Sequence, residues 1–293
     1  MSGTLAAALA AALGHAVAAD PDAAVHGGCI NESFRWLTES GPVFVKRAPL
    51  ARQWILEAER DGLERLHVAG AVSVPVVLAA GATGGAAFLV LEWLDLRPVD
   101  NASDARLGAA LAVLHGVQGP AFGLECDNAI GATPQPNAIA AQWPSFWRER
   151  RLGFQLDLAA RNGYAGRLQD RGRRLLEHVG EFFTGYEPLP SLLHGDLWNG
   201  NRAVRADGTP VVFDPAVYFG DSEADIAMTR LFGGFGPRFY AAYAAARPLD
   251  AGAATRRDLY NLYHVLNHLN LFGGGYRAQA EAMIDRLLAA TGH

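Results

Sequence analysis

The segment LLHGDLWNGN, residues 192–201, constrains the fold of this chain more than any other. An acid, Asp196, follows an apolar lead-in and a glycine, and an amide side chain, Asn201, comes five positions later. The next stretch, NRAVRADGTPVVFDPA, has two β-prone runs around an Ala-Asp-Gly turn and ends near a second acid, Asp214. The sequence therefore predicts a loop between a helix and a small β-hairpin, with two carboxylates and an amide gathered around it.

These three side chains have the composition of a phosphoryl-transfer centre. Asp196 could orient and deprotonate a substrate hydroxyl, and Asn201 and Asp214 are oxygen ligands suited to Mg²⁺ on nucleotide phosphates. Protein kinases carry H-R-D-x-x-x-x-N and D-F-G here, whereas this chain carries H-G-D with Asn201 and then D-P-A. H-G-D alone could be a turn whose aspartate caps a backbone amide. The ordered combination favours the catalytic interpretation.

A kinase also needs a cation for the phosphates, which a strand-borne lysine held by a helix-borne glutamate supplies. The apolar run VFVK ends at Lys46, and the helical stretch after it carries Glu57 and Glu59. Each could instead be a solvent-exposed charge. We predict Glu59 as the partner of Lys46 and keep Glu57 as the alternative.

The stretch HGGCIN, residues 26–31, precedes the first clear strand, where a loop over the nucleotide is expected. It lacks the G-x-G-x-x-G pattern, but Gly27 and Gly28 permit close backbone approach to phosphates. Cys29 could be a plain small apolar residue, or it could respond to oxidation if it is exposed beside the phosphates.

The hydrophobic periodicity predicts an α+β fold with two lobes. Half of the 293 residues are hydrophobic, enough for one large domain or two lobes. Strands are expected at 32–40, 41–49, 72–81 and 86–96, and a helix at 51–70 with Trp54, Ala58, Leu63 and Leu66 on one face. Further helices are expected at 106–115, 143–160, 168–183, 225–231 and 259–272. The predicted N-lobe is 1–94, the hinge 95–100 and the helical C-lobe 101–293.

Composition excludes several classes of protein. The net charge of −5 argues against a nucleic-acid binder. No Lys or Arg precedes the apolar N-terminal run, so it is expected to be a packed helix rather than a signal peptide, and no segment reaches membrane-spanning length. Two cysteines provide no disulfide framework, and a cytoplasmic protein without a membrane partner is expected.

Three other groups of residues have simpler interpretations. His264 and His268 have helical i, i+4 spacing but no third ligand nearby, so a core or surface pair is favoured over a metal site. The aromatic residues of WPSFWRERRLGFQL are expected to form a buried helix face. Asp225 is expected to start a helix and hold the backbone of the Asp196 loop, and Asp221 and Glu223 to be solvated or to line a rim for a cationic amine.

The chain resembles the fructosamine kinase (ketosamine-3-kinase) family, in the aminoglycoside-phosphotransferase branch of the protein-kinase-like fold. The resemblance runs from about residue 26 to residue 276. The matching stretches are GGCINESF, VFVK, EAERDGLERL, FLVLEWL, GATPQPN, RRLGFQLDLA, LLHGDLWNGN, VVFDPAVYFGDSEADIAMTRLFGGF and LYHVLNHLNLFGGGY.

The resemblance implies ATP-dependent phosphorylation of the sugar C3 hydroxyl of ketosamines, the adducts that sugars form with amines. The phosphorylated product is unstable and frees the amine, so the implied function is deglycation of small molecules or proteins. It also implies site roles: Asp196 as catalytic base, Asn201 and Asp214 as Mg²⁺ ligands, Lys46 and Glu59 at the phosphates, and the backbone of Glu92, Trp93 and Leu94 at the adenine.

Trp198 lies two positions after the predicted base, where its flat face could pack on the sugar ring or simply fill space between elements. Two alternative functions remain: a phosphotransferase for an aminoglycoside, choline or similar alcohol, and a pseudokinase. The second is disfavoured because Lys46, Asp196, Asn201 and Asp214 are all present. The preferred sugar, free against protein-bound acceptors, and the oligomeric state stay open.

Overall fold

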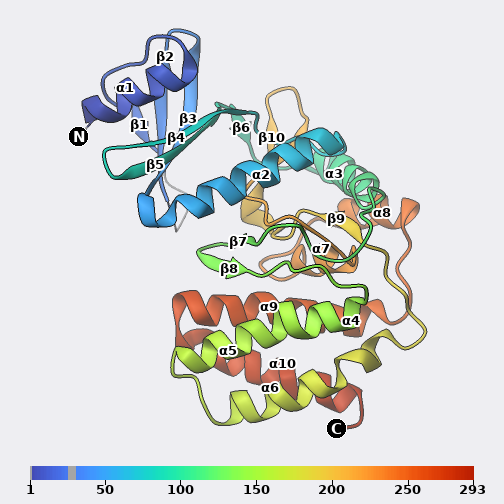
Figure 1. Cartoon of the computed structure of the whole chain (residues 1–293). Coiled ribbons are helices and arrows are strands. Elements are labelled where there is room, and N and C mark those ends of the chain that lie inside the picture. The colour runs from blue at the N-terminus through green and yellow to red at the C-terminus, as the bar shows by residue number, and fades with distance from the viewer. Residues whose placement is uncertain (1, 26–30) are drawn as a thin grey trace.

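The computed structural model describes residues 2–25 and 31–293, which form a strand-rich N-terminal region and a mainly helical C-terminal region. Figure 1 shows the two regions one above the other. The α+β architecture is as predicted. Gly27, Gly28 and Cys29 lie outside the described residues, so their role over the nucleotide stays a prediction. Among the described helices, none is both long and apolar enough to cross a membrane.

The N-terminal region is built on a five-stranded antiparallel sheet of order β1-β2-β3-β5-β4. Its strands are β1 (Ala23–Ala24), β2 (Glu32–Thr38), β3 (Gly41–Pro49), β4 (Val77–Thr83) and β5 (Ala86–Glu92). The predicted strand at 41–49 has the observed bounds of β3. The one predicted at 72–81 begins only at Val77, because Pro75 offers no backbone donor to a ladder and Ser73 pairs with Val211 of another sheet.

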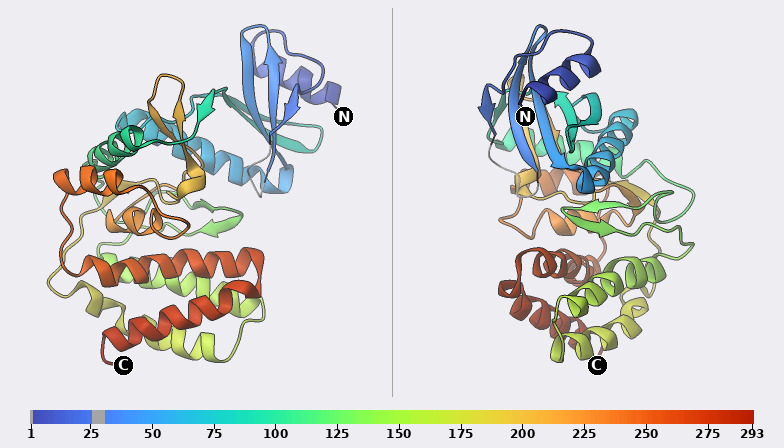
Figure 2. Two further views of the ribbon diagram at one scale, coloured as in Figure 1. Left: turned by 180° about the vertical axis from the view of Figure 1, so that it is seen from behind. Right: turned by 60° about the vertical axis from the view of Figure 1, so that its left-hand side comes forward.

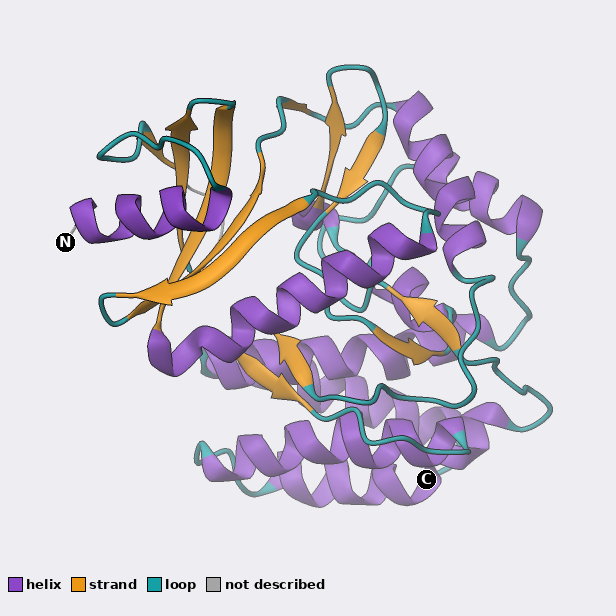
Figure 3. Ribbon diagram, turned by 45° about the horizontal axis from the view of Figure 1, so that its top comes forward, coloured by secondary structure: helices purple, strands orange, loops and turns teal. Residues whose placement is uncertain are grey.

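Two helices cover the two faces of this sheet, α1 (Ser2–Leu13) and α2 (Gln53–Ala69), as Figure 3 shows. Side chains alternate between the faces of a strand, and β5 follows this rule. Phe88 and Val90 pack in the cluster that contains α1, whereas Leu89 and Leu91 pack in the cluster that contains α2. Both faces of β5 are therefore buried, and this fixes the position of the neighbouring strand β3.

The helix α2 ends as predicted, because Gly70 takes the left-handed conformation with φ 65° and its N–H closes the last turn. Its buried face differs from the prediction. The buried apolar residues are Ile55, Leu56, Leu63 and Leu66, whereas Trp54 is 36% exposed. Trp54 lies one position before this face begins, and its side chain is not among the buried residues of α2.

The C-terminal region is mainly helical, and its largest helix, α9 (Ala253–Phe272), lies against α5, α7 and α10 (Figure 2). The run predicted at 143–160 is helical but contains a wide π-helical segment. The other helices are α3 (Asn101–Leu114), α4 (Trp143–Phe146), η2 (Trp147–Gly153), α5 (Phe154–Arg161), α6 (Arg167–His178), η3 (Val179–Phe183), α7 (Glu223–Met228), α8 (Pro237–Ala246), η5 (Gly274–Tyr276) and α10 (Arg277–Ala290), with the turns η1 (Leu50–Arg52) and η4 (Asn199–Asn201) elsewhere.

Small antiparallel sheets position the loops of this region. The predicted hairpin is present as β10 (Arg202–Arg205) and β11 (Pro210–Val212), and β6 (Leu96–Arg97), in the connection between the regions, extends it. A helix was predicted before the Asp196 loop, but the structure has a strand there, β9 (Ser191–Leu193), which pairs with β12 (Tyr218–Gly220). The remaining pair is β7 (Asn128–Ile130) with β8 (Thr133–Gln135).

Candidate active site

The loop between β9 and β10 carries Asp196, and a close backbone approach shapes it. Gly195 has φ 84°, and a Cβ atom there would lie 2.0 Å from the carbonyl oxygen of Ala216. The N–H of Ala216 donates to the carbonyl of His194 at 2.8 Å. The arginine of the protein-kinase motif could not stand at this position without moving the backbone, which explains why the motif reads H-G-D.

Asp225 binds the backbone of this loop, as the sequence predicted. Its carboxylate accepts hydrogen bonds from the backbone N–H groups of His194 and Gly195, at 2.7 and 2.8 Å. The Nε2 atom of His115 lies 3.2 Å from the same carboxylate. Burial by itself would raise the pKa of Asp225, but His115 and these donors hold it below its usual range. A buried anion therefore holds the two residues that precede Asp196.

Asp196 and Asn201 interact directly. The Nδ2 atom of Asn201 donates to the backbone carbonyl of Asp196 at 2.9 Å and lies 3.3 Å from its Oδ2. Burial, and then the charge of Asp214, raises the pKa of Asp196 to about 8. With its nitrogen used in this way, Asn201 keeps its side-chain oxygen for another partner.

Lys46 pairs with both predicted carboxylates. Its Nζ lies 2.6 Å from Oε1 of Glu59 and forms an ion pair with Asp214. Lys46 and Glu59 are 9% and 8% exposed, whereas Glu57 accepts a hydrogen bond from Gln53 on the outside of the helix. The geometry thus places Glu59, not Glu57, beside Lys46. These ion pairs join β3, α2 and Asp214, two positions after β11.

The pKa shifts in this triad follow from burial and charge. Burial raises the pKa of Glu59 to about 7, against the pull of Lys46. Burial acts the same way on Asp214, but Lys46 outweighs it and holds the pKa of Asp214 below its usual range. Asp214 also has φ 57°, a backbone conformation that few non-glycine residues adopt. Such strain at a carboxylate is typical of functional sites.

The residues predicted at the adenine lie at the end of β5 and directly after it. The Glu92 carboxylate accepts from the backbone N–H of Val76 at 3.0 Å and pairs with Arg205 of β10 at 2.5 Å. Trp93 stacks under the guanidinium of Arg35, which lies 5.2 Å from its ring centre. The side chain of Glu92 therefore joins the two regions. Only the backbone atoms of Glu92 remain for the predicted contact with adenine.

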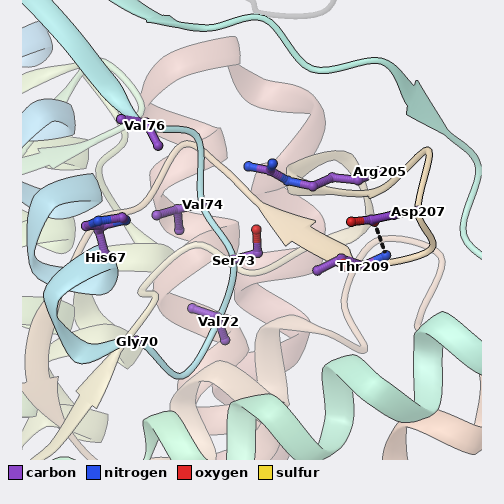
Figure 4. A pocket seen from close by; sticks show the side chains of 9 residues that line it. All are labelled: His67, Gly70, Val72, Ser73, Val74, Val76, Arg205, Asp207 and Thr209. Atoms are coloured by element: carbon purple, nitrogen blue, oxygen red, sulfur yellow. Dashed lines mark hydrogen bonds between the residues drawn. The ribbon is translucent and has the colours of Figure 1, made fainter.

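A cavity of about 300 Å³ lies beside this connection, between the end of α2 and the hairpin. Figure 4 shows its lining, with Arg205 and Asp207 entering from the hairpin side. The lining residues, none of which belongs to the predicted site, are His67, Gly70, Val72, Ser73, Val74, Val76, Arg205, Asp207 and Thr209.

Trp198 belongs to an aromatic surface next to Asp196. Its ring is 36% exposed and covers Gly200, where a Cβ atom would lie 2.2 Å from the indole. Phe232 meets Trp198 edge to face, with centroids 6.2 Å apart, and His268 lies 4.6 Å beyond Phe232. Of these three aromatic residues, the sequence predicted only Trp198 at this surface. Its partners come from distant segments: Phe232 lies in the stretch VVFDPAVYFGDSEADIAMTRLFGGF and His268 in LYHVLNHLNLFGGGY.

His268 enters this surface as a neutral imidazole, because burial lowers its pKa. Its Nδ1 lies 2.8 Å from the carbonyl oxygen of His264. A carbonyl oxygen can only accept, so Nδ1 carries the proton and Nε2 is left as an acceptor. Burial also lowers the pKa of His264, to about 3. The two histidines are a core and half-buried pair, as predicted, but His268 also borders the candidate site.

Asp221 and Glu223 differ from the prediction, which left them solvated or on a rim for a cationic substrate. They are 1% and 5% exposed. Asp221 accepts from the hydroxyls of Tyr186 and Tyr260, at 2.9 and 2.5 Å, and Glu223 forms a two-pronged ion pair with Arg256 at 2.7 and 2.8 Å. Both acids are satisfied inside the protein and are not available to a substrate.

Comparisons with known proteins find one family over nearly the whole chain. The family model "Fructosamine kinase" matches residues 1–290. A Synechocystis protein assigned as a ketoamine kinase is 45% identical over 90% of this chain and 89% of its own length. The chloroplastic protein-ribulosamine 3-kinase of Arabidopsis thaliana is 41% identical over 90% of this chain and 81% of its own length.

Solved structures extend the similarity to the fold. A Haemophilus somnus protein assigned as a fructosamine-3-kinase has a TM-score of 0.87 at 30% identity, over 97% of both chains. An aminoglycoside phosphotransferase with bound ADP has a TM-score of 0.58 at 14% identity, over 90% of both chains. The latter likeness concerns the protein-kinase-like fold alone. Since the family model spans nearly the whole sequence and relatives match most of it at over 40% identity, this chain belongs to the fructosamine kinase family.

Proposed function

We propose that this protein transfers the γ-phosphoryl group of ATP to the 3-hydroxyl of a ketosamine. The observation that carries the proposal is the convergence of Lys46, Glu59 and Asp214 beside the Asp196–Asn201 pair. These are the parts that phosphoryl transfer requires: a cation, metal ligands and a base. Membership of the fructosamine kinase family supports the choice of acceptor. The 3-phosphorylated product is unstable and eliminates, which frees the amine and deglycates its carrier.

In this mechanism Asp196 acts on the acceptor hydroxyl. As the hydroxyl oxygen bonds to the γ-phosphorus and the bond to the β-phosphate oxygen breaks, the hydroxyl proton passes to the Asp196 carboxylate and ADP leaves. A base works best when its pKa lies near the working pH, and burial raises that of Asp196 to about 8. Asp225 holds the backbone so that the carboxylate keeps its place.

The support for Mg²⁺ comes from the side chains themselves, because Asn201 and Asp214 offer the oxygen ligands that this ion prefers. Asn201 is tied to Asp196 through its nitrogen, so its side-chain oxygen is the atom left for a cation. Asp214 is 43% exposed on the side-chain scale and keeps a low pKa. Two hard oxygen ligands would bind Mg²⁺ together with the phosphates and water. The cation would offset phosphate charge during transfer.

The nucleotide would lie between the two regions. Lys46, held by Glu59, would bind its phosphates, and the backbone of Glu92, Trp93 and Leu94 would hydrogen-bond the adenine. Gly27, Gly28 and Cys29 would cover the phosphates. The anionic phosphates would compete with Asp214 for the ammonium of Lys46.

The proposal is tested by measuring ATP consumption with Mg²⁺ and a panel of acceptors: ribulose-lysine, fructose-lysine, a glycated protein, an aminoglycoside and choline. We expect turnover on ketosamines, with phosphate appearing on O3, and turnover lowered at least ~10³-fold in the Asp196→Asn variant. Turnover on an aminoglycoside or choline alone would replace the proposed acceptor. ATP binding without turnover on any acceptor would indicate a pseudokinase.

The Trp198 ring is proposed to pack on the acceptor. Trp198→Ala is expected to raise KM for the ketosamine about 10-fold, the equivalent of ~1.4 kcal/mol of lost contact, while KM for ATP stays unchanged. Steady-state kinetics with each substrate varied would measure this split. Trp54→Ala is a matched control, because Trp54 is also 36% exposed but lies on α2. Equal effects of the two substitutions would remove Trp198 from the acceptor site.

A further inference from the structure

Three side chains that the proposed function does not use converge where α6 and α10 end. His178 is the last residue of α6, Glu181 lies in η3 directly after it, and His293 follows α10. Figure 1 shows the C-terminus beside the segment that follows α6. The three residues are part-exposed, with side-chain exposures of 21%, 47% and 31%, so ions from solution can reach them.

The possible ligand atoms are already close together. The Nδ1 atom of His178 lies 2.7 Å from Oε1 of Glu181, and the Nε2 atom of His293 lies 3.5 Å from the same oxygen. The ligand atoms of the three residues all lie within 4.8 Å of one another. Ligands bound at about 2.1 Å in a tetrahedral arrangement are separated by roughly 3.4 Å. The two imidazole rings are stacked, with centroids 3.5 Å apart and 25° between their planes, so one ring would have to rotate out of the stack for all three residues to bind one ion.

The backbone holds His293 in this position. Gly292 has φ 81°, and the N–H of His293 turns back to donate to the carbonyl of Leu288 at 2.8 Å. This is the hydrogen-bonding pattern of a glycine-terminated helix end. It directs His293 toward η3 instead of away from the protein.

The two helices are also held together independently of these ligands. Asp285 of α10 accepts from Arg167 and Arg171 of α6, at 2.5 and 2.9 Å. These ion pairs hold the backbone of α6 and α10 together before any ion binds. The residues that carry the three ligands are therefore already close. Such preorganisation lowers the entropic cost of binding.

We propose that His178, Glu181 and His293 form a binding site for Zn²⁺. Two imidazole nitrogens and one carboxylate are a ligand set that Zn²⁺ favours, and the fourth position would be open to water. Mg²⁺ favours oxygen ligands instead, so this site would not compete for the ion that Asn201 and Asp214 are proposed to bind. The bound ion would link α10 to η3 and stabilise the helical region.

The test uses the full-length protein and Co²⁺ as a spectroscopic substitute for Zn²⁺. Titration with Co²⁺ in excess Mg²⁺ is expected to give visible d–d absorption that saturates at one ion per chain and is displaced by Zn²⁺. Thermal unfolding should shift upward with Zn²⁺, since an ion that binds only the folded state stabilises it.

The variants Glu181→Gln and His293→Gln should each weaken Co²⁺ and Zn²⁺ binding at least ~10-fold, since even partners of metal ligands contribute that much. The control is His67→Gln, an exposed histidine on α2, which should bind the ion like the unmodified protein. Circular dichroism would confirm that all variants fold. Unchanged binding in both ligand variants, or no saturable absorption, would overturn the proposal.

Discussion

Asp196→Asn is expected to abolish nearly all phosphoryl transfer, lowering kcat by ~10³- to 10⁴-fold, which corresponds to ~4 to 5.5 kcal/mol in the barrier. Asparagine keeps the size of the side chain but cannot accept the proton of the acceptor hydroxyl. Asn201 can still donate to the backbone carbonyl of residue 196, so the loop should keep its shape. Rapid-quench measurement of a single turnover would isolate the chemical step, and nucleotide binding measured by calorimetry should change little.

The pH dependence of kcat/KM distinguishes a base from a merely structural carboxylate. In the proposed mechanism the deprotonated form of Asp196 is the active one, so kcat/KM should rise with pH through the pKa of this group. That pKa is raised to about 8 by burial and by the charge of Asp214, so the acidic limb should lie well above pH 4. Added Mg²⁺ should move the limb downward, since a cation offsets the charge of Asp214.

The same pH profile measured on the residual activity of Asp196→Asn should be flat over this range. Persistence of an unchanged acidic limb in the variant would assign the titration to another group and remove Asp196 from the role of base. A normal kcat in Asp196→Asn would also show that Asp196 is not the base.

Asp225→Ala is expected to cost ~3 to 5 kcal/mol in the free energy of unfolding, as removal of one partner from a buried charged network usually does. The N–H groups of His194 and Gly195 and the Nε2 of His115 would all lose their acceptor in a site that is 1% exposed. Urea unfolding followed by circular dichroism would measure the loss.

The same substitution should affect catalysis through position. A displacement of about 1 Å in a catalytic group can cost ~100-fold in rate, so kcat should fall by about that factor while KM for ATP changes little, because Lys46 and Glu59 are untouched. Asp250→Ala is the matched control, an acid that is half-exposed and leaves Arg256 paired with Glu223. Asp225→Asn keeps one acceptor oxygen, so its kcat and its free energy of unfolding should lie between those of Asp225→Ala and Asp250→Ala. Equal stability of Asp225→Ala and the control would contradict the assigned role.

The parts of the site that could be predicted are those that lie close together in the sequence. Asp196, Asn201 and the hairpin before Asp214 occupy one segment, and the turn residues Gly195 and Gly208 within it have the positive φ that such turns require. The bounds of β3 and the end of α2 at Gly70 were predictable for the same reason. Local backbone preference determines these features.

The choice between Glu57 and Glu59 shows an intermediate case. Residues three and four apart share a helix face, so Glu59 lies with Leu56 and Leu63, whereas Glu57 does not. That pattern was present in the sequence, but Trp54 obscured it. Only the packing of α2 on β5 showed which face of the helix is turned inward.

Burial and long-range pairing could not be predicted. The strands β9 and β12 are three residues each and stabilise each other only as a pair, so neither has a local signal. Asp221 and Glu223 resembled solvated acids until Tyr260 and Arg256, more than thirty positions away, proved to be their partners. The aromatic surface around Trp198 likewise combines segments from three parts of the chain.

By itself, the sequence determined which chemical groups this protein has and which of them lie near one another along the chain: two carboxylates, an amide, a lysine and the turns that carry them. The tertiary structure decided which carboxylates are charged and free to act and which are neutralised inside. The physical reason is that the free energy of a charge depends on its burial and on its nearest partner. In this fold, distant segments supply both.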